Sequence, residues 1–259
     1  AVLAVAGSAL ALSARPRIKA AGALLREAAT IGALYGLWQL AGQVSVTGTQ
    51  DAFTRAEWIE SFERSLPLPS EQTLQHLILG HGWLVQGANL YYAGMHISVM
   101  LGFLLWLFVR HRAHYRPIRQ VMAWATLGCL AIQLIPVAPP RMLSALGFVD
   151  TAAVYGPAVY GPPNQNTLAD QYAAMPSLHI GWAVMVAIGI IAATPTRWRW
   201  LAVLHPIATT LVVVSTANHF WLDGMVALSL LAASLIVVRS ISEPRIDVPD
   251  FVPVLASPA

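Results

Sequence analysis

The sequence predicts an all-α, polytopic membrane protein, and three observations support this fold class. Hydrophobic residues make up 57% of the 259 residues and charged residues only 10%, whereas soluble domains carry about 25% charged residues. Apolar stretches close to the roughly 20 residues that a helix needs to cross a bilayer recur along the chain. Lys and Arg are distributed unevenly between the segments that connect these stretches.

Six apolar stretches are predicted to be membrane-spanning helices, because backbone groups in lipid must find hydrogen-bond partners within their own helix. They cover residues 28–46, 82–109, 118–137, 176–193, 200–217 and 219–238. Together they define a membrane domain over residues 28–240, followed by a C-terminal tail at 241–259. Residues 1–27 form an N-terminal segment that is cytoplasmic or truncated. Within it, the apolar residues 1–13 are too short to span, and a truncated span, a signal remnant and a surface helix remain open.

The positions of Lys and Arg predict the orientation of these helices. If the N-terminus is cytoplasmic and six helices alternate, twelve of the fifteen basic residues fall on the inner side. The outer side then holds only Arg55, Arg64 and Arg141. This positive-inside bias predicts cytoplasmic N- and C-termini. We also expect a location in the plasma membrane.

Two long segments fall on the predicted outer side. Residues 47–81 contain alternating charged and aromatic side chains, among them Glu57, Trp58 and Phe62, which suits a helix lying at the membrane interface. Residues 138–175 are rich in Pro, Gly, Asn and Tyr, which is typical of a loop. A loop of this length is either disordered or functional, and its polar neighbours favour a function.

Composition and motifs argue against several other classes. The basic residues form no single stripe, so the net charge of +3 is no sign of nucleic-acid binding. Cys129 is the single cysteine, no Cys/His spacing resembles a zinc site, and no Gly-rich loop follows a strand pattern. We therefore expect neither a metal nor a cofactor.

A proline and a histidine mark the outer start of the fourth predicted helix, in the run Met175–His179. Pro176 is tolerated in a first helical turn, and the free N–H groups there favour an anion. Ser177 adds a hydroxyl donor, and His179 faces the same water. The alternative interpretation is a capped helix with an interfacial histidine.

A second histidine lies at the outer junction of the fifth and sixth predicted helices. His219 and Asp223 are four residues apart, which predicts that they share a helix face and hydrogen-bond to each other. A carboxylate that holds one ring nitrogen fixes the tautomer and leaves the other nitrogen as a nucleophile or base. The alternative interpretation is a structural His–Asp pair.

Arg141 ends the run Pro136–Arg141 on the same predicted side, and its planar fork suits a phosphate or a carboxylate. The alternative is an arginine that reaches a lipid headgroup. The predicted topology brings Arg141, His179 and His219 with Asp223 to one level of the membrane. Two histidines, one aspartate, one arginine and a helix N-terminus predict a phosphate site with an acid–base pair and no metal ligand set.

Other polar residues are candidates for lining this site. Asn89, Tyr92 and His96 fall in the outer half of the second helix, where hydrogen bonding between helices is the alternative explanation. The remaining candidates are Asp170 and Tyr172 on the outer loop, and Asn218 beside His219.

The runs MPSLHIGW and TANHFWLD resemble the second and third signature motifs of the type 2 phosphatidic acid phosphatase (PAP2) superfamily. With PVAPPRM, they are most similar to its branch related to inositol phosphorylceramide synthase. The resemblance covers roughly residues 28–240. It implies a six-helix bundle with an extracytoplasmic site and a lipid phosphate substrate. By position, His219 would attack phosphorus, Asp223 would orient it, and His179 would protonate the leaving oxygen, with a phosphohistidine as intermediate.

The chain departs from the full family pattern at several positions. The usual Lys and Pro of the first motif are replaced by Leu134 and Met142, and the Ser-Arg of the third by Val212 and Val213. The pocket therefore has one cation where the family commonly has three, which favours a singly charged phosphodiester or greater reliance on backbone donors.

Three interpretations remain open after this resemblance. The intermediate could be resolved by water, as in a phosphatase, or by a polyol hydroxyl, as in an inositol-phosphate-type headgroup transferase. A third interpretation is a non-catalytic lipid-binding or transport protein with a proton relay, although transporters tend to place ionisable groups near the midplane. The sequence gives no indication of the oligomeric state.

Overall fold

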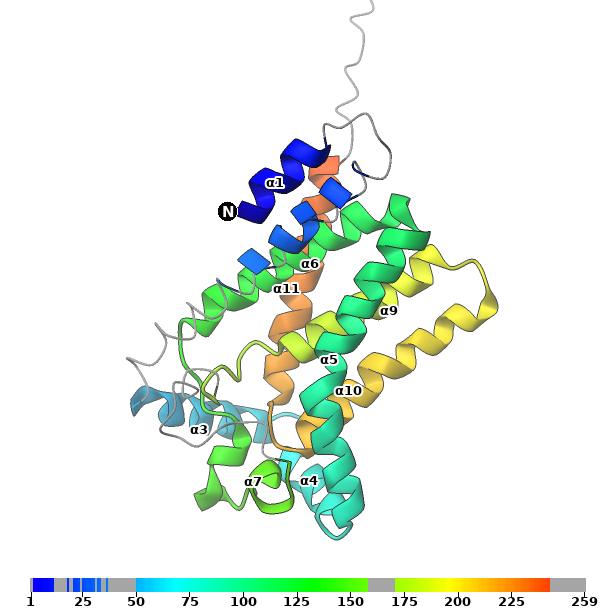
Figure 1. Cartoon of the computed structure of the whole chain (residues 1–259). Helices are drawn as coiled ribbons and strands as arrows, with labels where there is room; N and C mark the ends of the chain where they lie inside the picture. Colours follow the sequence, from blue (N-terminus) through cyan, green and yellow to red (C-terminus); the bar gives the residue numbers. More distant parts are fainter. Residues whose placement is uncertain are drawn as a thin grey trace, which may run out of the picture.

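The computed structural model describes residues 2–11, 18, 21–23, 25–30, 32–33, 36, 50–157 and 171–242. Across these residues the regular structure is helical, apart from one isolated parallel bridge between Val137 and Ala173. The helices, shown in Figure 1, are α1 (Val2–Ala11), α3 (Gln50–Arg64), α4 (Glu71–Leu79), α5 (Gly82–Arg110), α6 (Arg112–Gln133), η2 (Pro140–Met142), η3 (Ser144–Leu146), α7 (Thr151–Tyr155), α9 (Leu178–Ala193), η4 (Arg197–Val203), α10 (Leu204–Ser215) and α11 (Trp221–Ser242). The all-α prediction is confirmed for the described part of the chain.

Several of these helices suit a membrane. In the described part, the segments long and apolar enough to cross one are Gly82–Arg110, Arg197–Ser215 and Trp221–Ile241. α9 is apolar but shorter. α6 occupies most of the predicted span 118–137, although its first two turns carry arginines. The predicted span 28–46 lies mostly outside the described residues, so the total of six spans stays a prediction. The apolar helices fit an integral membrane protein.

The centre of the bundle is formed by α6, α9 and α11, which pack against one another, and by α5, which packs against α6 and α9 (Figure 1). Their shared core contains buried Phe103, Leu107, Met122 and Met185. Gly189 of α9 lets α5 approach closely, because a Cβ atom there would lie 2.3 Å from Cζ of Phe103. This packing fixes α9 against its neighbours and so places its first turn.

Three short helices, α3, α4 and α7, lie at the end of the bundle where α11 begins (Figure 1). α3 buries Ala52, Ala56 and Ile59 at helical spacing, and they share a core with residues that flank the starts of α9 and α11. Trp58 and Phe62 on the same helix are exposed, with their rings stacked 5.6 Å apart. An amphipathic helix is thus present where the sequence predicts one, and its location at the membrane surface stays a prediction.

The predicted loop 138–175 contains more regular structure than its composition indicates. η2, η3 and α7 occupy its first part, and Asp150 caps α7 by accepting a hydrogen bond of 3.0 Å from the Ala153 amide. Val137 N–H donates to the Tyr172 carbonyl at 2.8 Å, which brings the end of the segment back to its beginning. The chain before α9 therefore runs beside the chain after α6.

Two predicted helix starts each lie two residues before the observed ones. α9 begins at Leu178 with Ser177 as its N-cap, so Pro176 lies before the first turn rather than in it. α11 begins at Trp221, so His219 lies outside the helix and shares no helix face with Asp223. Ser177 caps α9 by accepting a hydrogen bond from the Ile180 amide, and Asp223 accepts one from the Phe220 amide just before α11. These two caps set where the helices begin.

Candidate active site

His219 is held by two acceptors on one side of its ring. Its Nδ1 lies 2.8 Å from the Ala174 carbonyl oxygen and 3.2 Å from Oδ2 of Asp223. A carbonyl oxygen can only accept, so Nδ1 carries the proton, and Nε2 is left with its lone pair in the neutral ring. The histidine–aspartate hydrogen bond that the sequence predicts is therefore present, although a helix cap rather than a shared helix face creates it.

His179 lies opposite this lone pair. Its Nδ1 is 3.2 Å from Nε2 of His219, and since that nitrogen accepts, Nδ1 of His179 is the donor. Nε2 of His179 is buried and has no hydrogen-bond partner among the described residues. The two imidazoles thus come from the starts of different helices and face each other directly.

α5 adds two rings to this cluster. The Tyr92 ring stacks on His179 with centroids 4.5 Å apart, and the His96 ring lies 4.0 Å from His179. Nδ1 of His96 donates to the Tyr92 carbonyl at 3.3 Å. Two of the three candidate residues from the second predicted helix, Tyr92 and His96, therefore lie beside His179 and confine its position.

Arg141 is buried, at 5% exposure, and is held in place at several points. Its Nε donates to Oδ1 of Asn218 at 3.0 Å, and Nη1 lies 3.2 Å from Oδ2 of Asp150. Its backbone N–H donates to the Ala217 carbonyl at 2.8 Å. Because Asn218 directly precedes His219, the bond to Arg141 links the guanidinium group to the histidine segment.

Ser177 is completely buried and serves as the N-cap of α9. Its hydroxyl accepts a hydrogen bond of 3.4 Å from the Ile180 amide, and its own amide donates to the Asp223 carbonyl at 3.0 Å. Ser177 therefore joins the starts of α9 and α11. The Ile180 amide is one of the helix-terminal donors that the sequence would assign to an anion, and in this structure it is occupied by the cap.

The other candidate residues lie in different surroundings. Asn89 is buried and binds the α7 segment, donating to the carbonyls of Thr151 and Gly156 at 3.0 and 2.9 Å. Tyr172 packs edge-on against Phe53 with ring centroids 6.0 Å apart. Asp170 lies outside the described residues. The contacts of Asn89 are those of a structural anchor, and a role in lining the substrate stays a prediction for all three.

Sequence reasoning missed three acidic residues near the site. Asp150 pairs with Arg141, and Glu63 and Glu71 accept the first backbone N–H groups of α11. Asp150 has a recognisable signal as a helix cap, because a run of helix-forming residues and a Gly follow it. Nothing local in the sequence connects Glu63 or Glu71 to α11, since about 150 residues separate them.

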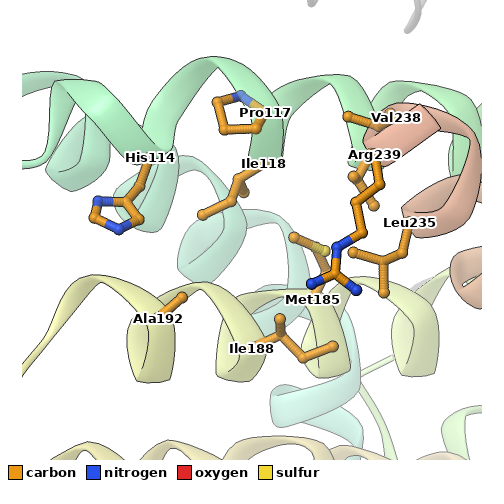
Figure 2. A pocket seen from close by; sticks show the side chains of 10 residues that line it. His114, Pro117, Ile118, Met185, Ile188, Ala192, Leu235, Val238 and Arg239 are labelled. Carbon is orange, nitrogen blue, oxygen red and sulfur yellow. The ribbon is translucent and has the colours of Figure 1, made fainter. Parts of the chain in front are cut away.

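One cavity among the described residues lies away from these side chains. It has a volume of about 330 Å³ and is bordered by α6, α9 and α11, with Met185, Leu235 and Arg239 among its lining residues (Figure 2). Arg239 lies near the end of α11, whereas His219 precedes its start. Among the described residues, no group of three or more His, Cys, Asp or Glu side chains is placed to hold a metal ion.

Comparison with known proteins agrees with this arrangement. No curated protein and no solved structure shows significant similarity to the chain. A family model described as the PAP2 superfamily matches residues 57–237, a range that contains Arg141, both facing histidines and Asp223. Membership of this superfamily indicates a phosphatase or phosphotransferase that acts on lipid phosphates in a membrane. Since the match covers well over half of the 259 residues, the chain belongs to the PAP2 superfamily.

Proposed function

We propose that this protein cleaves or transfers the phosphate group of a lipid phosphoester through a covalent phosphohistidine on His219. The observation that carries the proposal is the facing pair of imidazoles, with Nδ1 of His179 3.2 Å from Nε2 of His219. A nucleophile within hydrogen-bond reach of an acid–base group, itself oriented by a third group, is the arrangement that covalent catalysis requires. Asp223 is that third group.

In the first step, the Nε2 lone pair of His219 forms a bond to phosphorus while the bond from phosphorus to the leaving oxygen breaks. The imidazole of His219 becomes positively charged, and the buried Asp223 carboxylate and the Ala174 carbonyl both accept from its Nδ1–H. Stabilising a charge that develops during the reaction by preorganised groups lowers the barrier. For this step the phosphoryl group must enter between the two rings and replace their hydrogen bond.

His179 supplies the proton that the leaving oxygen needs. To act as the acid, His179 must be an imidazolium, a form that the negative charge of an entering phosphate favours, and it then donates from Nδ1, the nitrogen that faces His219. The neutral His179 then takes a proton from water or from an acceptor hydroxyl, whose oxygen attacks phosphorus as the P–N bond breaks. General acid–base catalysis of this kind contributes about 10²- to 10⁴-fold.

Arg141 is the proposed phosphate-binding residue. Asn218 and Asp150 fix its guanidinium group from two directions, so that the positive charge is preorganised beside the histidines. His179 lies in the first turn of α9, next to the Ser177 cap, and the positive end of the helix dipole favours an anion there.

The distribution of basic residues supports an active site on the extracytoplasmic side of the membrane. The basic residues of α6, η4 and the end of α11 lie at the opposite end of the bundle from His219. By the positive-inside rule, the proposed active site is extracytoplasmic. α3 would then lie along the outer surface, with Trp58 and Phe62 towards the lipid headgroups.

Hydrolysis and transfer differ only in the acceptor of the second step. Transfer to a polyol, as in the branch related to inositol phosphorylceramide synthase, is favoured by the shortage of cations: Leu134 and Val213 occupy positions where the family has Lys and Arg. Leu134 is 48% exposed and Val213 is buried among apolar side chains.

The experiment that tests this function incubates the purified protein with phosphate-labelled phospholipids, with and without inositol. With a phosphomonoester we expect free phosphate or an inositol phosphate, with a phosphodiester we expect the headgroup phosphate or a new inositol phosphodiester, and we expect none of these products with H219A. A wild-type protein that binds these lipids and turns none of them over would instead favour the non-catalytic interpretation.

A further inference from the structure

Two buried glutamates meet at the start of α11. Glu63 is the penultimate residue of α3, and Glu71 is the first residue of α4. They are only 5% and 4% exposed. Buried carboxyl groups are costly unless they are paired or protonated, so their joint position requires an explanation.

Both glutamates bind backbone donors of α11. Oε1 of Glu71 accepts from the Trp221 amide at 3.3 Å, and Oε1 of Glu63 accepts from the Leu222 amide at 2.5 Å. The preceding amide, that of Phe220, donates to Asp223. Carboxyl groups from three different helices therefore satisfy three successive N–H groups at the helix start, which would otherwise lack partners.

One proton is needed to complete this arrangement. Oε2 of Glu63 is buried and receives no hydrogen bond from an N–H or hydroxyl donor of the described residues, while the Glu71 carboxyl group lies beside it. Burial raises the pKa of Glu63 to about 9, with further contributions from Glu71 and Asp223. Arg64 borders a small cavity together with Glu63 and Glu71, but its Nε pairs with Glu60. At neutral pH, Glu63 is therefore protonated and donates to Glu71.

From this geometry we propose that Glu63 and Glu71 form a proton-sharing carboxyl pair that positions His219 for catalysis by fixing the start of α11. His219 lies outside the helix, so the direction of its ring depends on where α11 begins. The Trp221 and Leu222 amides that the pair binds are two and three residues away. Glu63 and Glu71 are thus positioning residues, and the inference rests on the proposed role of His219.

The pair has a predictable pH dependence. A proton shared between two buried carboxyl groups is lost as the pH rises through about 9, the pKa of Glu63. Two adjacent carboxylates would then repel each other and Asp223. Their separation would release the start of α11 and with it His219, so activity should fall on this alkaline side.

The isosteric variant E63Q tests the proposal. Glutamine keeps an acceptor for the Leu222 amide and supplies a permanent N–H donor for Glu71. We expect E63Q to retain the neutral-pH activity that E63A loses by roughly ten- to hundredfold, since small displacements of catalytic groups cost this much. We also expect E63Q to keep its activity above pH 9, where the wild type declines. E60Q is the matched control, because Glu60 is buried on the same helix but pairs with Arg64.

A stability measurement separates this inference from the proposed catalysis. Because the pKa of Glu63 is raised from 4.5 to about 9, the folded state binds more protons than the unfolded state between these values. Wild-type stability should then fall with rising pH across this window and level off above it, and E63Q should lack that slope. Two results would overturn the pairing. One is a free energy of unfolding that varies with pH in the same way in wild type and E63Q, and the other is an activity of E63Q that falls above pH 9 as the wild type does. Absence of turnover in the wild type would count against the proposed function alone.

Discussion

Nε2 of His219 lies 3.2 Å from Nδ1 of His179, although 40 residues separate them in the chain. The two rings come from the starts of α11 and α9. The Ser177 amide, which donates to the Asp223 carbonyl, holds these two helix starts together. A phosphoryl group that entered between the rings would meet a nucleophile on one side and a proton donor on the other.

The general-acid role of His179 predicts a dependence on the leaving group. H179A should slow turnover of lipid phosphoesters with poor alkoxide leaving groups by about 10²- to 10⁴-fold. With a nitrophenyl phosphodiester, whose leaving oxygen needs no proton, the loss should be much smaller. Equal losses in steady-state rate on both substrates would argue against proton donation by His179.

Asp223 is predicted to act through its charge. In D223N, an amide oxygen can keep the contacts with the Phe220 amide and with Nδ1 of His219, while the negative charge is lost. The turnover number should fall by about 10²-fold or more, because the imidazolium that forms on attack is no longer balanced. E57Q, which neutralises an exposed glutamate on α3, is the control and should behave like the wild type. A fully active D223N would leave Asp223 a structural role only.

The sequence predicted which residues come together at the candidate site better than it predicted their geometry. His179, His219, Asp223 and Arg141 were identifiable because ionisable groups at the predicted ends of apolar helices are rare and costly. Their relation to the helices was not, because periodicity cannot locate a helix start to within a residue. Asp223 accepts the Phe220 amide and so fixes the start of α11 at Trp221, which leaves His219 outside the helix.

Contacts between segments that are distant in the sequence could not be predicted from sequence patterns. The bonds from Glu63 and Glu71 to α11 span about 150 residues, and Asn89 binds a carbonyl 62 residues away. No local pattern records such pairings. In the fold, apolar length predicted α5 and α11 well, whereas the short helix α7 was obscured by the Pro and Gly residues that follow it.

We predict that lysine cannot replace Arg141 without loss of activity. Arginine reaches Asn218 through Nε and Asp150 through Nη1, and a lysine cannot match this fork. R141K should therefore lose kcat/KM nearly as completely as R141A, by roughly 10²-fold, since buried charged hydrogen bonds contribute about 1.5–3 kcal/mol each. R55K, at an arginine whose polar contacts in the described part of the chain are the Pro136 carbonyl and the exposed Asp51, should stay near wild type. Near-normal activity of R141K would reduce the role of Arg141 to charge alone.

Two glycines of α9 should respond differently to alanine. At Gly189, a Cβ atom would lie 2.3 Å from Cζ of Phe103, and this overlap should destabilise the fold by about 1–3 kcal/mol. At Gly181, the nearest atom outside the helix backbone is the Ala227 Cβ at 3.6 Å, an ordinary contact. Thermal unfolding in detergent should therefore show a lower midpoint for G189A and an unchanged or higher midpoint for G181A. Equal midpoints would contradict the close packing of α9 against α5.

Trapping of the intermediate tests the central claim most directly. The protein is mixed with a phosphate-labelled lipid, quenched in alkali during turnover, and its peptides are analysed for labelled phosphate. The account predicts an acid-labile, alkali-stable phosphoryl group on His219 that is formed by the wild type and E57Q and is absent from H219A. Turnover without any such adduct, or a label that persists in H219A, would contradict it.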